Sequence, residues 1–110
     1  MKKIVFKRGN KFLFLQLDEI DFISADRNYI RIFINDEYFV ERKTLKDVEA
    51  ELDARKFVRI NKSIIVNRER IKEISYDNNY QYYVTLECGK SLKWGRKYIG
   101  HLHSIIRPER

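Results

Sequence analysis

The sequence predicts a mainly β fold of about eight to ten short strands in antiparallel sheets, with one short internal helix and a helix at the C-terminus. Seven tyrosines, seven phenylalanines and many isoleucines and valines suit pleated, half-buried surfaces better than a helical bundle. Short apolar runs alternate with polar or glycine-containing turns. One proline, four glycines and no low-complexity tract give no sign of a linker, so residues 1–110 are expected to form a single domain.

The first element is predicted to be a hairpin from Lys2 to Gln16. An apolar run at 4–6 precedes a turn at Gly9-Asn10, where glycine can adopt a positive φ angle, and a second apolar run follows at 12–15. The hairpin has five cations and no acid: Lys2, Lys3, Lys7, Arg8 and Lys11. Lysines commonly protect an exposed strand edge from aggregation, so this cluster has a structural explanation.

Three strands separated by polar turns are predicted next. The strands are 20–24, 29–34 and 38–40, and the turns before them are 17–19, 26–28 and 35–37. The second strand alternates, with Ile30, Ile32 and Ile34 on one face and Tyr29, Arg31 and Phe33 on the other. The acids in this region lack the regular ligand spacing and glycine of a calcium-type loop, so we interpret them as solvated turn charges.

Thr44 is predicted to begin the internal helix, because its hydroxyl can accept a hydrogen bond from a free backbone N–H of the first turn. Asp47 suits the positive end of the helix dipole, and Leu45, Val48 and Leu52 fall on one face. The helix is expected to end near Arg55-Lys56, where cations suit the negative end.

The C-terminal half is predicted to contain a second hairpin, a further strand and the final helix. Strands at 71–76 and 80–86 flank a turn at 77–79, and Cys88-Gly89 then turns the chain into a strand at 91–93. From Arg96 the apolar spacing becomes helical, although Gly100 costs about 1 kcal/mol relative to alanine. Pro108 is expected to end this helix.

The net charge of +7 favours an anionic partner, either nucleic acid or an acidic lipid surface. The single cysteine, Cys88, cannot pair within the chain, and no cationic start followed by a long apolar run indicates a signal peptide. The longest apolar runs are far shorter than the roughly 20 residues that span a bilayer. We therefore expect a soluble, cytoplasmic protein without a membrane association.

No residues form a recognisable catalytic or metal-binding pattern. His101 and His103 are the only histidines, and two residues apart on a helix they point in different directions, which disfavours a shared zinc ion. None of the four glycines falls in a P-loop or dinucleotide-binding pattern. The sequence therefore predicts a protein that is not an enzyme and needs no cofactor.

Two cationic segments remain as candidate binding sites. Arg59 and Lys62 interrupt the apolar stretch 57–67, which places them where that stretch reaches the surface; cations snorkelling from a half-buried strand are the alternative. Arg96 follows a glycine and opens the final helix, so its planar guanidinium can contact the O6 and N7 atoms of guanine together. An ion pair between Arg96 and an acidic turn is the competing interpretation.

An ordered set of segments extends over nearly the whole chain: 21–25 with Asn28-Tyr29, Thr44-Leu45, 57–67, 71–74, and Gly89 with Leu92, Arg96 and Tyr98. This set resembles the LytTR DNA-binding domains, which typically form the output half of bacterial response regulators. The resemblance implies an elongated fold of mainly antiparallel strands that inserts loops into successive major grooves and touches the minor groove between them. It also implies a sequence-specific transcriptional regulator with double-stranded DNA as its partner.

The resemblance further implies roles for individual residues. The base-reading residues are Asn28, Tyr29 and Arg96. The residues on phosphates or the DNA backbone are Arg27, Lys62, Ser63, Gly95 and Lys97. Two positions depart from the family pattern, because Gly95 stands where a serine usually precedes the arginine and Asn61 often corresponds to a histidine. These departures are expected to alter the preferred DNA sequence more than DNA binding itself.

Other readings of the chain stay open at this point. Most relatives carry a phosphoacceptor receiver domain upstream, so the chain is expected to be either an excised fragment or a stand-alone regulator, and dimers on repeated sites are compatible with the resemblance. The main alternative function is a single-stranded nucleic-acid-binding β-barrel that uses Tyr80, Tyr82 and Tyr83 as stacking platforms. A protein-interaction module with incidental positive charge is the third.

Overall fold

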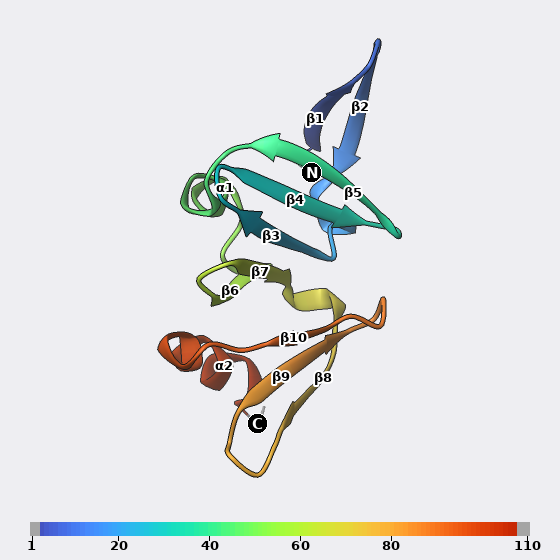
Figure 1. The fold of residues 1–110 in the computed structure, drawn as a ribbon. Coiled ribbons are helices and arrows are strands. Elements are labelled where there is room, and N and C mark those ends of the chain that lie inside the picture. The colour runs from blue at the N-terminus through green and yellow to red at the C-terminus, as the bar shows by residue number, and fades with distance from the viewer. Residues whose placement is uncertain (1–2, 108–110) are drawn as a thin grey trace.

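The computed structural model describes residues 3–107, so the predicted hairpin start at Lys2 and the predicted helix stop at Pro108 lie outside the described residues. Within that range ten strands form three antiparallel sheets of two, five and three strands. The sheets follow one another along a body of 49 × 33 × 25 Å (Figure 1). The mainly β, elongated fold is therefore as predicted.

The N-terminal hairpin consists of β1 (Lys3–Arg8) and β2 (Lys11–Gln16). Gly9 in its turn has a φ of 62°, a value that suits glycine because it has no Cβ. Alternate residues of the two strands, with Phe6 the most buried, pack on the first hydrophobic core. The predicted hairpin is confirmed in the described residues.

The five-stranded sheet lies at the centre of the molecule, in the order β5-β4-β3-β7-β6. Its strands are β3 (Phe22–Asp26), β4 (Tyr29–Ile34), β5 (Glu37–Arg42), β6 (Phe57–Asn61) and β7 (Ile64–Asn67). Ile30, Ile32 and Ile34 all point into the first core, which confirms the predicted alternation. Burying one such side chain stabilises the fold by about 1.5–3 kcal/mol.

A second core covers part of the other face of this sheet, chiefly at β3, β6 and β7. It is closed by β8 (Ile71–Tyr76), β9 (Tyr82–Leu86), β10 (Ser91–Lys93) and the C-terminal helix α2 (Ile99–Ile106). Phe22 points into this core whereas its neighbour Ile23 points into the first, because successive side chains of a strand face opposite sides. The central sheet is therefore buried on both faces at β3, β6 and β7, whereas Tyr38 and Val40 leave the second face of β5 exposed.

Helix α1 (Leu45–Glu51) begins as predicted, with the Thr44 hydroxyl oxygen accepting the N–H of Asp47 at 3.1 Å. The predicted end near Arg55-Lys56 is wrong, since Leu52 already has an extended backbone (ψ 151°). The cause is Asp53, whose carboxylate accepts the backbone N–H of Arg55 at 2.9 Å. Such a local side-chain hydrogen bond competes with the helical pattern.

Other strand boundaries shift by one or two residues, and the final α-helix begins at Ile99 rather than at Arg96, which lies in a preceding 3₁₀ turn. Strand β3 extends to Asp26, so the predicted loop 26–28 is only Arg27-Asn28, and β9 begins at Tyr82 rather than Tyr80. Short 3₁₀ helices occupy Leu17–Glu19 (η1), Arg68–Arg70 (η2) and Arg96–Tyr98 (η3).

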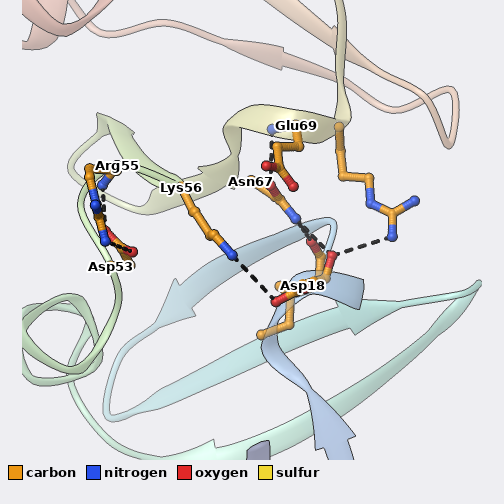
Figure 2. Close-up of polar contacts among 8 residues, drawn as sticks. Asp18, Asp53, Arg55, Lys56, Asn67 and Glu69 are labelled. Carbon is orange, nitrogen blue, oxygen red and sulfur yellow. Dashed lines mark hydrogen bonds and ion pairs between the residues drawn. The ribbon is translucent and has the colours of Figure 1, made fainter. Parts of the chain in front are cut away.

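The buried side chain of Asn67 ties two of these 3₁₀ helices together. Its amide nitrogen donates to the carbonyl oxygens of Asp18 (3.0 Å) and Ile20 (2.8 Å), and its oxygen accepts the N–H of Glu69 (3.0 Å). Figure 2 shows this side chain beside Asp18, which Lys56 also approaches, at 3.9 Å. The chain entering β3 and the chain leaving β7 are thereby held together.

Candidate nucleic-acid interface

Three turns lie at the same edge of the molecule. Antiparallel pairing places the β3–β4 turn beside the β6–β7 turn, because Ser24 pairs with Ile64. The segment after β10 follows on the same side, so the three turns form a row along the long axis (Figure 1). We call the row of residues 26–29, 61–63 and 94–98 the basic edge.

Hydrogen bonds connect each turn of the basic edge to the next. The N–H of Ala25, at the end of β3, donates to the carbonyl oxygen of Ser63 at 2.8 Å. The N–H of Gly95 donates to the carbonyl oxygen of Ile60 at 2.7 Å, and the Asn61 amide nitrogen donates to that of Lys93 at 2.8 Å. The spacing of the turns is therefore fixed by direct bonds between their backbones.

The first turn projects side chains from a tight backbone. Arg27 has a φ of 59°, and the carbonyl oxygen of Asn28 accepts the N–H of Lys43 at 3.1 Å. The Lys43 ammonium pairs with Glu51 of α1 and, at 3.8 Å, with Glu41. The hydrogen bond to Glu51 raises the pKa of Lys43, so this brace between the turn and α1 is charged at neutral pH.

Beside this turn is a hollow of about 470 Å³, lined by Asp26, Arg27, Asn28, Tyr29, Arg31 and Val40. The Tyr29 ring is 47% exposed over it. The Asp26 carboxylate pairs with the Arg31 guanidinium at 3.3 Å. The charge of Arg27 is therefore not balanced by Asp26, and the turn has a net positive charge. Alternation predicted only a sheet residue at Tyr29, and its place at the end of β4 puts it on the basic edge.

The part-buried Arg59 side chain supports the second turn, Lys62-Ser63, through hydrogen bonds to its backbone. The Arg59 guanidinium donates to the carbonyl oxygens of Asn61 (2.9 Å) and Lys62 (2.6 Å) and to the Glu49 carboxylate (2.9 Å). It also lies over the Tyr98 ring, 5.8 Å from its centroid. Of the two cations that interrupt the apolar stretch, Arg59 thus supports the turn and Lys62 is exposed on it.

The third segment is anchored by Trp94, which is 1% exposed. Its indole N–H donates to the carbonyl oxygen of Tyr98 at 2.7 Å and so closes the loop that carries Arg96 and Lys97. Both cations are exposed. Within residues 3–107 no carboxylate lies within 4 Å of the Arg96 guanidinium, so the alternative of an ion pair with an acidic turn is not found there.

Gly95 and Asn61 are in contact. A Cβ atom added to Gly95 would lie 3.1 Å from the Asn61 Cβ, which is closer than ordinary van der Waals contact. Asn61 itself is fixed, since its side-chain oxygen accepts the N–H of Ser63 at 2.7 Å. The two positions at which the sequence departs from the LytTR pattern therefore form one contact between the second and third turns.

The opposite edge of the molecule has the opposite charge. There the β4–β5 turn (35–37) and the β9–β10 turn (87–90) present Asp36, Glu37 and Glu87. Two cations lie beside these acids: Lys90, and Arg8, which pairs with Glu37 at 3.4 Å. A hollow of about 230 Å³ joins the two turns and is lined in part by Asp21. Burial raises the pKa of the Asp21 carboxyl, although Arg70 and the backbone N–H of Asn35 oppose the shift. We call residues 35–37 and 87–90 the acidic edge.

Two exposed cations that flank the basic edge were missed by sequence reasoning. Arg42 ends β5 directly opposite Tyr29, and Lys93 ends β10 directly before Trp94. Only the strand pairing brings them to the predicted residues. No periodicity or motif in the sequence marks either one.

Neither α-helix within residues 3–107 has the length and apolar character that a membrane crossing requires. In the same range no three side chains of the His, Cys, Asp and Glu types gather as a metal site.

Comparisons with known proteins agree with this geometry. The family model for the LytTr DNA-binding domain matches residues 10–107. A solved LytTr DNA-binding domain from Bacillus cereus superposes with a TM-score of 0.85 at 16% identity, over 98% of this chain and 99% of that one, which shows the shared fold.

Two curated relatives are sensory transduction proteins named LytT. The Bacillus subtilis protein is 23% identical over 104 residues, which are 94% of this chain and 43% of the relative. The Enterococcus faecalis protein is 28% identical over 82 residues, which are 74% of this chain and 34% of the relative. The chain thus spans less than half the length of either relative.

Proposed function

The chain belongs to the family of LytTr DNA-binding domains, and on that premise we propose that it binds duplex DNA sequence-specifically through the basic edge and regulates transcription. The loops of this edge enter two successive major grooves, and the middle turn lies over the minor groove between them. The basic edge carries this proposal, because it aligns three exposed cationic turns while acids gather on the opposite edge.

The proposed roles follow from what each residue has free to offer. Arg96 presents a planar guanidinium that has no acidic partner among residues 3–107, and this group suits the paired acceptors of guanine. Asn28 and Tyr29 present an amide and a ring beside the hollow of the first turn. Arg27, Lys62 and Lys97 offer exposed charges for phosphates.

Ser63 and Gly95 contribute differently, because their backbones are already bonded within the fold. The Gly95 N–H donates to Ile60, so we assign to Gly95 the close approach of the backbone to DNA rather than a hydrogen bond. Ser63 keeps its hydroxyl for a backbone contact, and its backbone N–H and carbonyl oxygen are bonded to Asn61 and Ala25. We add Arg42 and Lys93 as phosphate contacts, since both are exposed next to the base-reading residues.

The wider setting is part of the proposal. We propose that this single domain acts in the cytoplasm as the output part of a longer regulator that also has a receiver domain. Its partner is double-stranded DNA, on which two copies can occupy repeated sites. The binding chemistry uses only side chains of the chain and requires no cofactor.

Selection of bound duplexes from a random pool tests the function directly. A groove-reading protein enriches one motif, and the motif gives both the preferred bases and the half-site spacing. Competition with an unpaired oligonucleotide of the same sequence distinguishes duplex binding from the single-strand alternative. That alternative uses Tyr82 as a stacking platform, and this ring is already partly packed against the second core. Preference for the unpaired strand, or absence of any enriched motif, contradicts the proposal.

Substitutions at Arg96 and Lys62 test the division of labour. Arg96→Ala should cost about 1–3 kcal/mol on the selected duplex and relax the preference at one base pair. Lys62→Ala should weaken binding to all duplexes alike and reduce the slope of log K against log salt by about one. Equal losses on every sequence for both variants would reject these roles.

A further inference from the structure

The turn between β8 and β9 holds an exposed tyrosine in an unfavourable backbone conformation. Tyr80 has a φ of 58° and is 73% exposed. A bulky residue in the left-handed region is strained and persists only where its surroundings hold it there. Nothing in the packing of the cores requires this ring, since its side chain lies outside both of them.

A dense set of hydrogen bonds keeps the turn in this conformation. The Asp77 carboxylate accepts the N–H groups of Asn79 (2.9 Å) and Gln81 (3.0 Å), and the Asp77 carbonyl oxygen accepts the N–H of Tyr80 (2.9 Å). The Tyr80 ring stacks on Tyr76, with centroids 5.7 Å apart and an interplanar angle of 12°. The turn therefore presents two stacked, exposed rings in a fixed position.

This turn is attached to the loop that carries Arg96. The Gln81 amide nitrogen donates to the carbonyl oxygen of Trp94 at 2.7 Å, and the N–H of Trp94 donates to the carbonyl oxygen of Tyr82 at 2.9 Å. Strand pairing of Lys93 with Tyr83 places both segments at the same end of the three-stranded sheet. In Figure 1 the β8–β9 turn lies beyond η3 and continues the row of turns along the long axis.

We propose that Tyr76 and Tyr80 form a fourth contact of the basic edge, on the sugar–phosphate backbone beyond the groove that Arg96 enters. This inference rests on the proposed function, and it extends the proposed DNA-binding surface by one further segment, the β8–β9 turn. Tyrosine hydroxyls donate to phosphate oxygens, and such neutral contacts fix register without reading sequence. The one carboxylate of the turn, Asp77, is already bonded to backbone N–H groups.

A protein partner fits this surface less well than DNA. Two tyrosine rings bury about 150–250 Å² each at most, whereas a specific protein interface needs roughly 1,000 Å² in total. A duplex that is already bound by the three turns of the basic edge does not need a large additional interface with the β8–β9 turn, because this turn only adds to the existing contacts. The partner is therefore the flank of the same duplex.

The test compares Tyr80→Asn with Tyr38→Thr. Asparagine tolerates a positive φ, so the turn keeps its backbone while the ring is lost. Tyr38 is a matched control, since it is 51% exposed beside the acidic edge. Two duplexes carry the selected motif, and one of them ends just beyond the base pair that Arg96→Ala affects while the other continues for about one helical turn.

Tyr80→Asn should weaken binding to the long duplex about three- to tenfold, as expected for one lost hydrogen-bonded contact, and leave the short duplex unchanged. Hydroxyl-radical footprinting should lose protection only on the flank, and the base preference and salt slope should stay as in the wild type. Tyr80→Phe, which keeps the ring and removes only the hydroxyl, should lose part of the same affinity. Tyr38→Thr should bind both duplexes as the wild type does.

Equal losses of Tyr80→Asn on both duplexes, or wild-type affinity for both, overturn this inference while the proposed function stands. Wild-type protein that discriminates among no duplexes overturns the proposed function and this inference together. Thermal unfolding of each variant is measured alongside, and the Phe variant decides the outcome if the Asn variant unfolds.

Discussion

At Gly95 and Asn61, a single added Cβ atom would change how the second and third turns of the basic edge pack together. They touch at the junction of the second and third turns, where an added Cβ would lie 3.1 Å from that of Asn61. Gly95 has an ordinary extended backbone (φ −79°), so the absence of a side chain serves the contact and not the backbone conformation. Resemblance alone marked these positions as two separate departures, and the structure joins them.

We predict that Gly95→Ser and Asn61→His are coupled. The serine alone overpacks against Asn61 and should lower the free energy of unfolding by about 1–3 kcal/mol. Histidine alone loses the Asn61 hydrogen bonds to Lys93 and Ser63. Histidine keeps the Cβ that the serine meets, but without the two hydrogen bonds residue 61 is free to move away from the serine. The double variant should therefore lose less than the sum of the two, with a coupling of about 0.5–3 kcal/mol in a urea-denaturation cycle. Additive losses would show that the contact is of no consequence.

The buried carboxyl of Asp21 predicts a pH-dependent stability difference. Burial raises its folded-state pKa above the ordinary 3.8, so the folded state binds the proton more tightly than the unfolded state. Stability is therefore lost as the pH rises through the interval above 3.8. The unfolding free energy of Asp21→Asn minus that of the wild type should be larger at pH 7 than at pH 3.

Asp53→Asn is the control with the opposite sign. Hydrogen bonds from Arg55 lower the pKa of the Asp53 carboxyl, so its contribution is present above pH 3.8 and lost below that value. The corresponding difference for Asp53→Asn should be smaller at pH 7 than at pH 3. The same pH trend in both variants would contradict the assigned causes.

At the scale of elements, Arg59 links three segments that are distant in sequence: α1 through Glu49, the β6–β7 turn, and η3 through Tyr98. Local signals made several elements predictable, such as Gly9 in the first turn and the alternating isoleucines of β4. The early end of α1 was not predictable, because the Asp53 turn competes with a helical pattern that the sequence continues. The role of Arg59 depends on tertiary partners and has no sequence signal.

We predict that Arg59→Lys displaces the second turn. Lysine keeps the charge but lacks the planar fork that reaches two carbonyl oxygens and a carboxylate together. Binding should weaken on all duplexes alike, and the salt slope should fall by about one because Lys62 no longer meets its phosphate. The control Arg55→Lys, whose partner is the exposed Asp53, should leave the slope unchanged. If Arg59→Lys has the salt slope of the wild type, Arg59 does not position Lys62 for phosphate binding.

At the scale of the whole molecule, charge is divided between the two edges. Antiparallel strands send alternate turns to opposite edges, so the order of basic and acidic turns along the chain becomes a separation in space. Net charge could be read from the sequence, whereas this separation required the strand order. The result is a molecule with exposed cationic turns on one edge and a small excess of acids on the other.

We predict that Asp36→Asn with Glu87→Gln changes association and not the bound complex. Both acids lie across the sheet from the basic edge, so their field is screened at 0.1 M salt, where the Debye length is about 10 Å, and reaches further at 0.01 M, where it is about 30 Å. Stopped-flow measurements should show faster association at the lower salt, with equal dissociation rates. A faster dissociation would place one of these acids in the complex.

The hydrogen bonds between the backbones of the three turns hold these turns at fixed distances from one another. Base pairs rise by about 3.4 Å each. The hydrogen bonds from Ala25 to Ser63 and from Gly95 to Ile60 join the three turns, so their spacing cannot change by that amount. On the proposed function, a target with one base pair inserted between its two contacted grooves should be out of phase with the protein, even when every contacted base is correct. The proposal therefore predicts that the distance between the two contacted grooves is as restricted in the target as the contacted bases are.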